Sequence, residues 1–247
     1  LIDYDTITFG KFIDSGASGK VYKAKLKSLA KDIFIEDKSV TIKCFSLNNY
    51  HGEYGFIDDV KCELEIYQKL FLTKYCCELI GYSYSRLNAD TQLYIIMKDY
   101  EVEGDLDTFK NQGEYWSKLN ERNKDQLEEN EYYYKYQRHE WVYDMNHSTK
   151  VNITKGLCLA IEELHSRDIV HCDMKPGNVL YNEENNQITL IDFGASHHIN
   201  KEKKIMIDEN MGTLGYACSE LNSGICSKRS DIYSLAVTIV EIWTGEI

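Results

Sequence analysis

The segment from His171 to Asn178 constrains this chain more than any other, because it gathers several chemically useful side chains. It reads His-Cys-Asp-Met-Lys-Pro-Gly-Asn, in which Lys175 lies two residues after Asp173 and Asn178 lies five residues after it. A second segment, Asp192-Phe193-Gly194, begins nineteen residues after Asp173. Mg²⁺ prefers oxygen ligands, usually one or two carboxylates together with phosphate oxygens. These side chains therefore suit phosphoryl transfer, in which catalysis is mostly positioning and neutralisation of charge.

The composition is that of an ordinary globular protein. Of the 247 residues, 43% are hydrophobic and 28% are charged, which allows one large domain or two small lobes. The net charge of -12 argues against general binding of nucleic acid, which needs Lys and Arg on phosphates. No apolar run reaches membrane-spanning length. We therefore expect neither nucleic acid nor membrane as a partner.

The eight cysteines are scattered, and they form no CxxC pair and no cluster with zinc-site spacing. Residues 1–10 lack the basic-then-apolar pattern of a signal peptide. We therefore expect reduced, mostly buried thiols and a cytoplasmic location.

The first hundred residues are mostly strand-like. Alternating or β-branched runs predict strands at 7–13, 21–26, 40–45 and 93–97. Apolar residues at helical spacing, from Val60 to Phe71, predict one helix among them.

Helices dominate the rest of the chain. Amphipathic spacing predicts a helix over 151–165, and short strands are expected at 179–181 and 188–191. An almost wholly apolar run over 231–243 predicts a helix that is buried on all sides. The polar, Glu- and Tyr-rich stretch 111–147 is interpreted as an insert.

Two features of the strand-rich part suggest contact with phosphates. Gly16 and Gly19 lie in a turn between expected strands, where glycine lets backbone N–H groups approach an anion; an ordinary hairpin is the alternative. Lys43 ends an apolar strand, and Glu63 lies on the following helix, twenty residues later. We expect these two to pair, with Glu65 as the competing partner on another face of the helix.

Five features follow one another along the chain: the glycine turn, the strand lysine, the helix glutamate, His-x-Asp-x-Lys-Pro-x-Asn and Asp-Phe-Gly. That order resembles the eukaryotic protein kinase family over nearly the whole chain. The resemblance implies an α+β fold with a small antiparallel β N-lobe carrying one helix and a larger, mainly helical C-lobe. The lobes are expected at 1–99 and 106–247, joined by a hinge at 100–105.

The resemblance also implies ATP and Mg²⁺ as cofactors and a role for each candidate residue. The ATP-binding residues would be Ile13, Gly16, Gly19, Val21, Lys43 and Glu63. Asp173 would be the catalytic base, and Lys175 would stabilise charge on the transferred phosphoryl group. Asn178 and Asp192 would hold Mg²⁺.

Other residues would have supporting roles in the same resemblance. His171 and Phe193 would pack two loops together, and Asp231 would anchor the backbone of the catalytic loop. The segment Gly212 to Glu220 resembles the end of an activation loop, which receives the protein substrate. Lys175 together with Thr213 is typical of kinases that phosphorylate serine and threonine, so we expect transfer of the γ-phosphate of ATP to a Ser/Thr hydroxyl.

Three departures from the family pattern bear on function. Asp14 stands where the first loop glycine would be, and Cys172 replaces an arginine that receives a phosphate on the activation loop. Control by loop phosphorylation is therefore not expected. The chain ends at residue 247, just after a segment, Glu241 to Gly245, that resembles the end of a helix after which the family has further helices, so the last C-lobe helices are expected to be absent.

Two alternatives stay open at this point. A pseudokinase, that is, a nucleotide-binding scaffold without turnover, is kept open by Asp14 and the missing helices, although the presence of Lys43, Asp173, Asn178 and Asp192 argues against it. A small-molecule phosphotransferase of the aminoglycoside or choline kinase type shares the His-x-Asp-x-x-x-x-Asn pattern. Such enzymes generally lack the pairing of Asp-Phe-Gly with Gly-Thr-x-x-Tyr-x-x-x-Glu that is found over 192–220.

Overall fold

The computed structural model describes residues 1–16, 19–27, 37–46, 53–87, 90–102, 105–106, 145–199, 204–206 and 212–245. The chain divides into two compact units, Leu1–Glu101 and Val102–Ile247. The expected lobe limits at 99 and 106 and the hinge between them stay a prediction.

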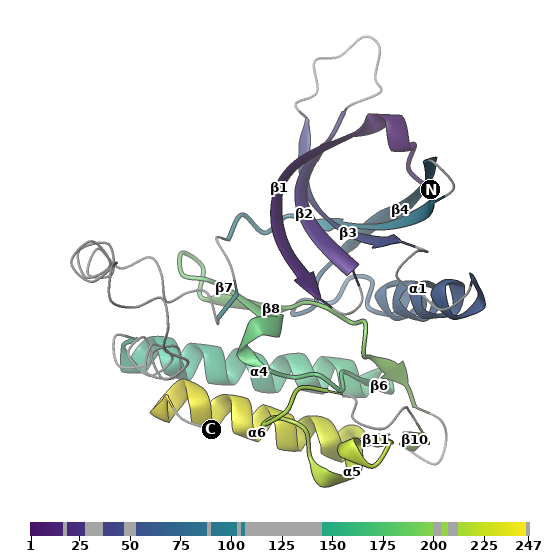
Figure 1. Ribbon diagram of the computed structural model, residues 1–247. Coiled ribbons are helices and arrows are strands. Elements are labelled where there is room, and N and C mark those ends of the chain that lie inside the picture. Colours follow the sequence, from purple (N-terminus) through teal and green to yellow (C-terminus); the bar gives the residue numbers. More distant parts are fainter. Residues whose placement is uncertain are drawn as a thin grey trace, which may run out of the picture. The chain divides into compact units, whose positions relative to one another are not determined.

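The first unit contains an antiparallel sheet and one long helix (Figure 1). The strands are β1 (Ile7–Gly16), β2 (Gly19–Leu26), β3 (Lys38–Ser46), β4 (Leu79–Leu87) and β5 (Asp90–Lys98). Their spatial order is β1-β2-β3-β5-β4, and every neighbouring pair is antiparallel. The 3-10 helix η1 (Tyr4–Thr6) precedes β1, and the helix α1 (Glu53–Lys69) connects β3 to β4.

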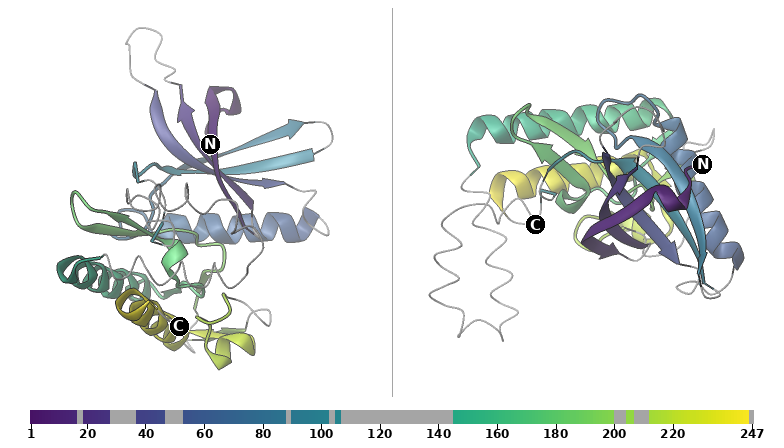
Figure 2. Two further views of the ribbon diagram at one scale, coloured as in Figure 1. Left: turned by 60° about the vertical axis from the view of Figure 1, so that its left-hand side comes forward. Right: turned by 90° about the horizontal axis from the view of Figure 1, so that it is seen from above.

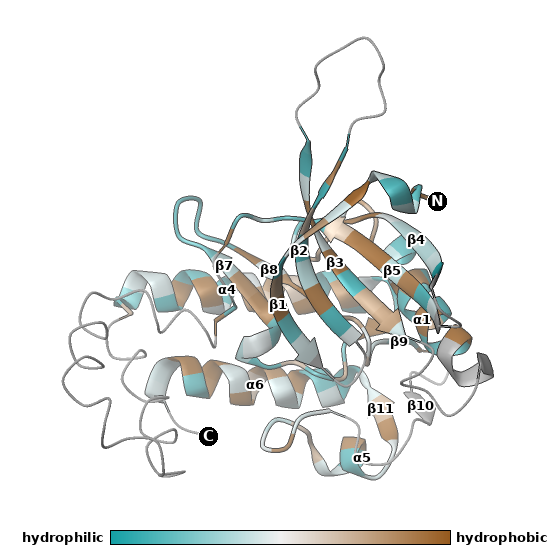
Figure 3. Cartoon of the chain, turned by 45° about the horizontal axis from the view of Figure 1, so that its top comes forward, coloured by the Kyte–Doolittle hydropathy of each residue, from teal (hydrophilic) through white to brown (hydrophobic). Residues whose placement is uncertain are grey.

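The strands β3 and β5 carry buried residues on both faces, which explains the apolar run from Leu93 to Met97 in β5. Val40 and Ile42 project to one face, where they pack with Tyr94 and Ile96 in a buried cluster. Phe45 lies on the opposite face of β3 and is also buried. The hydrophobic colour along β5 in Figure 3 reflects this double burial.

The helix α1 differs from its prediction at the C-terminal end. Val60, Tyr67 and Leu70 are buried as the helical spacing predicts. Phe71 was expected on the same face, but it is 62% exposed because the helix ends at Lys69. The buried face of the helix instead includes Glu63, a charged residue.

The second unit is mainly helical. Its helices are α4 (His147–Ser166), η4 (Pro176–Asn178), α5 (Ser219–Asn222) and α6 (Lys228–Thr244), and α4 and α6 lie side by side in Figures 1 and 2. Short antiparallel pairs join β6 (Ile169–Val170) to β9 (His197–His198), β7 (Val179–Asn182) to β8 (Gln187–Leu190), and β10 (Lys204–Met206) to β11 (Ile225–Ser227). Together with the sheet of the first unit, this confirms the predicted α+β class.

The helix α4 provides the centre of the second core. The five predicted core positions are all buried: Ile153, Leu157, Ala160, Ile161 and Leu164. The helix begins earlier than predicted, because the side chain of Asn146 accepts a hydrogen bond from the Thr149 N–H at 2.9 Å and caps it. Most of the predicted insert, residues 111–144, lies outside the described residues.

The prediction that the apolar helix is buried on all sides is wrong for α6. Leu235, Thr238 and Ile242 are buried, but Ile232 is 51% exposed and Val240 is 52% exposed. Among the described elements, the helix contacts α4, β6 and β11, and these contacts leave Ile232 and Val240 partly exposed.

The cysteines also require a correction. Cys172 and Cys226 are joined by a disulfide, whereas all eight thiols were expected to be reduced. The two residues are 54 positions apart, so no spacing motif predicts the bond. Only the fold brings the two cysteines together. The other six cysteines are free. Among the described residues, no helix is long and apolar enough to cross a membrane.

Candidate active site

The glycine turn of the first unit is a close-packed hairpin between β1 and β2. Gly16 pairs with Gly19 at its end, while residues 17 and 18 lie outside the described part. A Cβ atom on Gly19 would come within 2.5 Å of the Cys44 carbonyl oxygen, so only glycine fits. Of the two flanking apolar residues, Ile13 is exposed and Val21 pairs in register with Lys43.

A buried ion pair connects the sheet to the helix of the first unit. Lys43 lies inside β3 rather than at its end, and its Nζ atom donates to both carboxylate oxygens of Glu63, each at 2.9 Å. The two side chains are 5% and 2% exposed. The competing residue Glu65 is exposed and lies 4.0 Å from Lys61. The pair fixes the position of the lysine ammonium group.

In the second unit, Asp231 holds the backbone of the candidate catalytic loop, residues 171–178. This carboxylate is fully buried in the first turn of α6, and it accepts hydrogen bonds from the N–H groups of His171 and Cys172, both at 2.9 Å. His165 of α4 lies 2.9 Å from the same carboxylate. Cys172 has a φ of 63°, a left-handed conformation that is uncommon outside glycine. These bonds stabilise an otherwise unfavourable backbone.

The carboxylate of Asp173 lies in a network of three side chains. Its Oδ1 atom accepts from the Thr213 hydroxyl at 2.6 Å. Its Oδ2 atom lies 2.9 Å from the Lys175 ammonium and 3.0 Å from the Asn178 amide nitrogen. Lys175 also donates to the Thr213 hydroxyl at 2.8 Å. Four of the residues singled out by the sequence thus meet around one carboxylate.

The Asp192-Phe193-Gly194 segment is connected to this loop through the backbone and through two rings. The Ile191 N–H donates to the Asn178 carbonyl at 3.0 Å, and the rings of His171 and Phe193 have centroids 5.3 Å apart. Asp192 has a φ of 58°, a second left-handed residue at the site. The packing expected for His171 and Phe193 is therefore observed.

The donor chemistry of this loop fits Mg²⁺. Asn178 uses its amide nitrogen for Asp173, which directs its amide oxygen to other partners, and Asp192 supplies a carboxylate. Both are the hard oxygen donors that Mg²⁺ prefers. Among the described residues, no group of three or more His, Cys, Asp and Glu forms a ready metal site. Mg²⁺ would therefore depend on phosphate oxygens for its remaining ligands.

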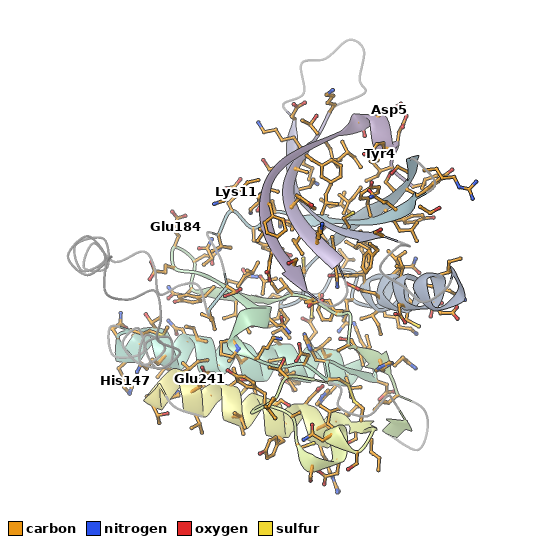
Figure 4. The ribbon with its side chains drawn as sticks, viewed as in Figure 1. Tyr4, Asp5, Lys11, His147, Glu184 and Glu241 are labelled. Carbon is orange, nitrogen blue, oxygen red and sulfur yellow. A yellow bond between two sulfur atoms is a disulfide. The ribbon has the colours of Figure 1, made fainter. Side chains whose placement is uncertain are left out.

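The segment that follows is held by residues that the sequence analysis did not single out. The Tyr216 hydroxyl donates to Glu241 of α6, and both side chains are buried. Glu241 is labelled in Figure 4. The Ser234 hydroxyl donates to the Tyr216 carbonyl at 2.9 Å. A glutamate inside an apolar helical run is the signal that was available for Glu241, because a buried carboxylate requires a partner.

Comparison with known proteins agrees with the resemblance. A model of the protein kinase domain matches residues 7–247. A probable serine/threonine-protein kinase of Dictyostelium discoideum is 29% identical over 214 residues, which cover 85% of this chain and 37% of that protein. A probable serine/threonine-protein kinase of Arabidopsis thaliana is 26% identical over 238 residues, which cover 94% of this chain and 47% of that protein.

A shorter match has higher identity. The serine/threonine-protein kinase RUNKEL of Arabidopsis thaliana is 38% identical over 91 residues, which cover 36% of this chain and 7% of that protein. The chain therefore spans less than half the length of each of these relatives.

Proposed function

The chain belongs to the protein kinase family, and from this premise we propose that it transfers the γ-phosphate of ATP to serine or threonine hydroxyls of a protein substrate. The observation that carries the proposal is the network around Asp173, in which Thr213 and Lys175 share one carboxylate. Such an arrangement positions a base and a cation together, which is what phosphoryl transfer requires.

In this proposal each residue of the network acts on one part of the reaction. Asp173 orients the substrate hydroxyl and accepts its proton. Lys175 stabilises negative charge on the transferred group, and Thr213 keeps the two side chains together. Asn178 and Asp192 would hold Mg²⁺, which when bound neutralises charge on the phosphates.

The residues of the first unit would bind the nucleotide. The glycine turn offers backbone N–H groups to phosphates, flanked by Ile13 and Val21. Lys43 would contact the α- and β-phosphates, and its pairing with Glu63 supports this role because the pair fixes the ammonium position. An intracellular location is part of the proposal, because six of the eight cysteines are free thiols.

The proposal is tested by supplying labelled ATP and Mg²⁺ with a generic protein substrate, and by hydrolysing the product to identify the phosphorylated amino acids. We expect labelled phosphoserine and phosphothreonine and no label when Mg²⁺ is chelated. Nucleotide binding is measured in parallel by calorimetry. Binding without transfer would identify a pseudokinase, and transfer to choline or an aminoglycoside but not to protein would identify a small-molecule phosphotransferase.

A further inference from the structure

The disulfide between Cys172 and Cys226 connects the catalytic loop to a different part of the second unit. Cys172 lies between His171 and Asp173, so the bond begins one residue before the proposed base. Cys226 lies in β11, directly before Ser227, the residue that caps α6. The bond therefore ties the loop to the start of the helix that also carries Asp231.

The same bond reaches the segment between Asp192 and Thr213. In the β10–β11 ribbon, Ile205 is the register partner of Cys226, and Ile205 belongs to that segment. At the end of the segment, a Cβ atom on Gly212 would lie 3.0 Å from the Cys172 carbonyl oxygen, so the two backbones are in close contact. Thr213, which donates to Asp173, follows immediately.

The bond is enclosed by apolar side chains and by a third cysteine. Cys172 is 1% exposed and Cys226 is 0% exposed, and they pack in one buried cluster with Val170, Ile199, Leu221 and the free cysteine Cys218. A reductant therefore reaches the bond only after local opening of this cluster.

We propose that the Cys172–Cys226 disulfide is a reversible modification that activates the enzyme, an inference that rests on the proposed kinase function. With the bond formed, the candidate catalytic loop and the β10–β11 ribbon are covalently connected, and the network around Asp173 is complete. Without it, the left-handed backbone of Cys172 keeps its hydrogen bond to Asp231 but loses its covalent connection to β11. Misplacement of catalytic groups by even a small distance lowers the rate strongly.

The chemistry of the switch is thiol–disulfide exchange. One thiolate of a dithiol reductant attacks a sulfur of the pair, which breaks the S–S bond and forms a mixed disulfide. The second thiolate of the reductant then releases the remaining protein sulfur. The two cysteines gain two electrons and two protons, and the dithiol is oxidised to its own disulfide.

Two observations favour a reversible bond over a permanent structural one. Six of the eight cysteines are free, which is unlike a chain built on a disulfide framework. The bond also lies at the candidate catalytic loop, and disulfides in intracellular proteins are usually transient and catalytic or redox-sensing. The free thiol of Cys218 in the same cluster offers a protein group for exchange.

The test compares the whole chain in glutathione disulfide with the same chain in dithiothreitol. Peptide mapping after alkylation should find Cys172 linked to Cys226 only in the oxidised sample, and reduction should lower the melting temperature by roughly 10 °C. Hydrogen exchange at 204–206 and 225–227 should become faster on reduction. The phosphotransfer rate should fall about tenfold or more and should recover on reoxidation.

Cys226→Ser and Cys226→Ala should both show the reduced rate and no response to either reagent, whereas Cys158→Ser, an exposed free cysteine on α4, should respond like wild type. Eight free thiols in the oxidised sample would overturn the proposal, as would a mapped bond whose reduction changes neither hydrogen exchange nor rate. Peptide mapping, the melting temperature and hydrogen exchange can be measured without catalysis. An inactive protein that still shows the bond would therefore contradict the proposed kinase activity and not the redox change.

Discussion

The Nζ atom of Lys43 lies 2.9 Å from each carboxylate oxygen of Glu63, and neither side chain is more than 5% exposed. The buried ammonium of Lys43 and the buried carboxylate of Glu63 stabilise each other, which offsets the cost of removing both charges from water. Removal of one partner leaves a buried charge without compensation, whereas removal of both does not. The pair is therefore expected to behave as a unit in stability measurements.

Glu63→Gln should lower the free energy of unfolding by about 3–5 kcal/mol, because the Lys43 ammonium stays buried beside a neutral amide. Denaturant unfolding measures this loss. The double variant Lys43→Met with Glu63→Leu should recover most of the stability while abolishing activity. Glu65→Gln is the matched control on the same helix, and it should change stability by less than about 0.5 kcal/mol, since Glu65 is exposed. Equal losses for both glutamines would contradict the pairing.

Asp231→Asn should destabilise the second unit by about 2–4 kcal/mol, because one amide oxygen cannot replace two carboxylate oxygens that accept from His171 and Cys172. Thermal and denaturant unfolding provide the measurement. Asp168→Asn is the control, since Asp168 makes an exposed ion pair with Lys228. Its backbone is left-handed, a conformation that asparagine also adopts. A stable Asp231→Asn protein would show that the loop is held by other contacts.

Thr213→Val should lower kcat by about 10- to 100-fold, because it removes the hydroxyl that joins Asp173 to Lys175. Thr213→Ser keeps the hydroxyl and should retain most of the rate. KM for ATP should stay the same in both, since the hydroxyl of Thr213 is bonded to Asp173 and Lys175, which are proposed to act on the transferred group. A loss of rate in Thr213→Ser as large as in Thr213→Val would argue against a hydrogen-bonding role.

Stability should fall as the pH rises above about 9. Burial raises the pKa of the Cys77 thiol from its ordinary 9.0 to about 12, and the neighbouring Cys76 adds a smaller effect in the same direction. The unfolded chain releases this proton near pH 9, whereas the folded chain keeps it, so alkaline pH favours unfolding. Urea unfolding at pH 8 and pH 10 measures the slope. Cys77→Ala should flatten the slope, and Cys158→Ala, at an exposed position, should leave it unchanged.

Much of the fold was predictable because local patterns and the ordered motifs agree. The strands 21–26 and 40–45 and the helix 151–165 follow from apolar periodicity, and each occurs as β2, β3 and α4. The pairing of Lys43 with Glu63 followed from their spacing on a strand and a helix. Local sequence was sufficient wherever the partner lay in a neighbouring element.

Features that depend on distant tertiary contacts were not predictable. Phe71 was expected on the buried face of α1, but the helix ends at Lys69 and Phe71 is exposed. The bond between Cys172 and Cys226 has no spacing signature. The partnership of Tyr216 with Glu241 likewise joins a loop to a helix that follows much later in the chain.

The most direct test of the proposed function is the rate of phosphate transfer from ATP to protein by wild type and by Asp173→Ala, with nucleotide affinity measured for both. The account predicts that the wild type transfers phosphate and that Asp173→Ala is slower by about 10²–10⁴-fold, because the base is lost. Nucleotide affinity should change much less than the rate, because the proposed role of Asp173 is on the substrate hydroxyl and its carboxylate contacts Thr213, Lys175 and Asn178. An equal rate of transfer in Asp173→Ala would contradict the account.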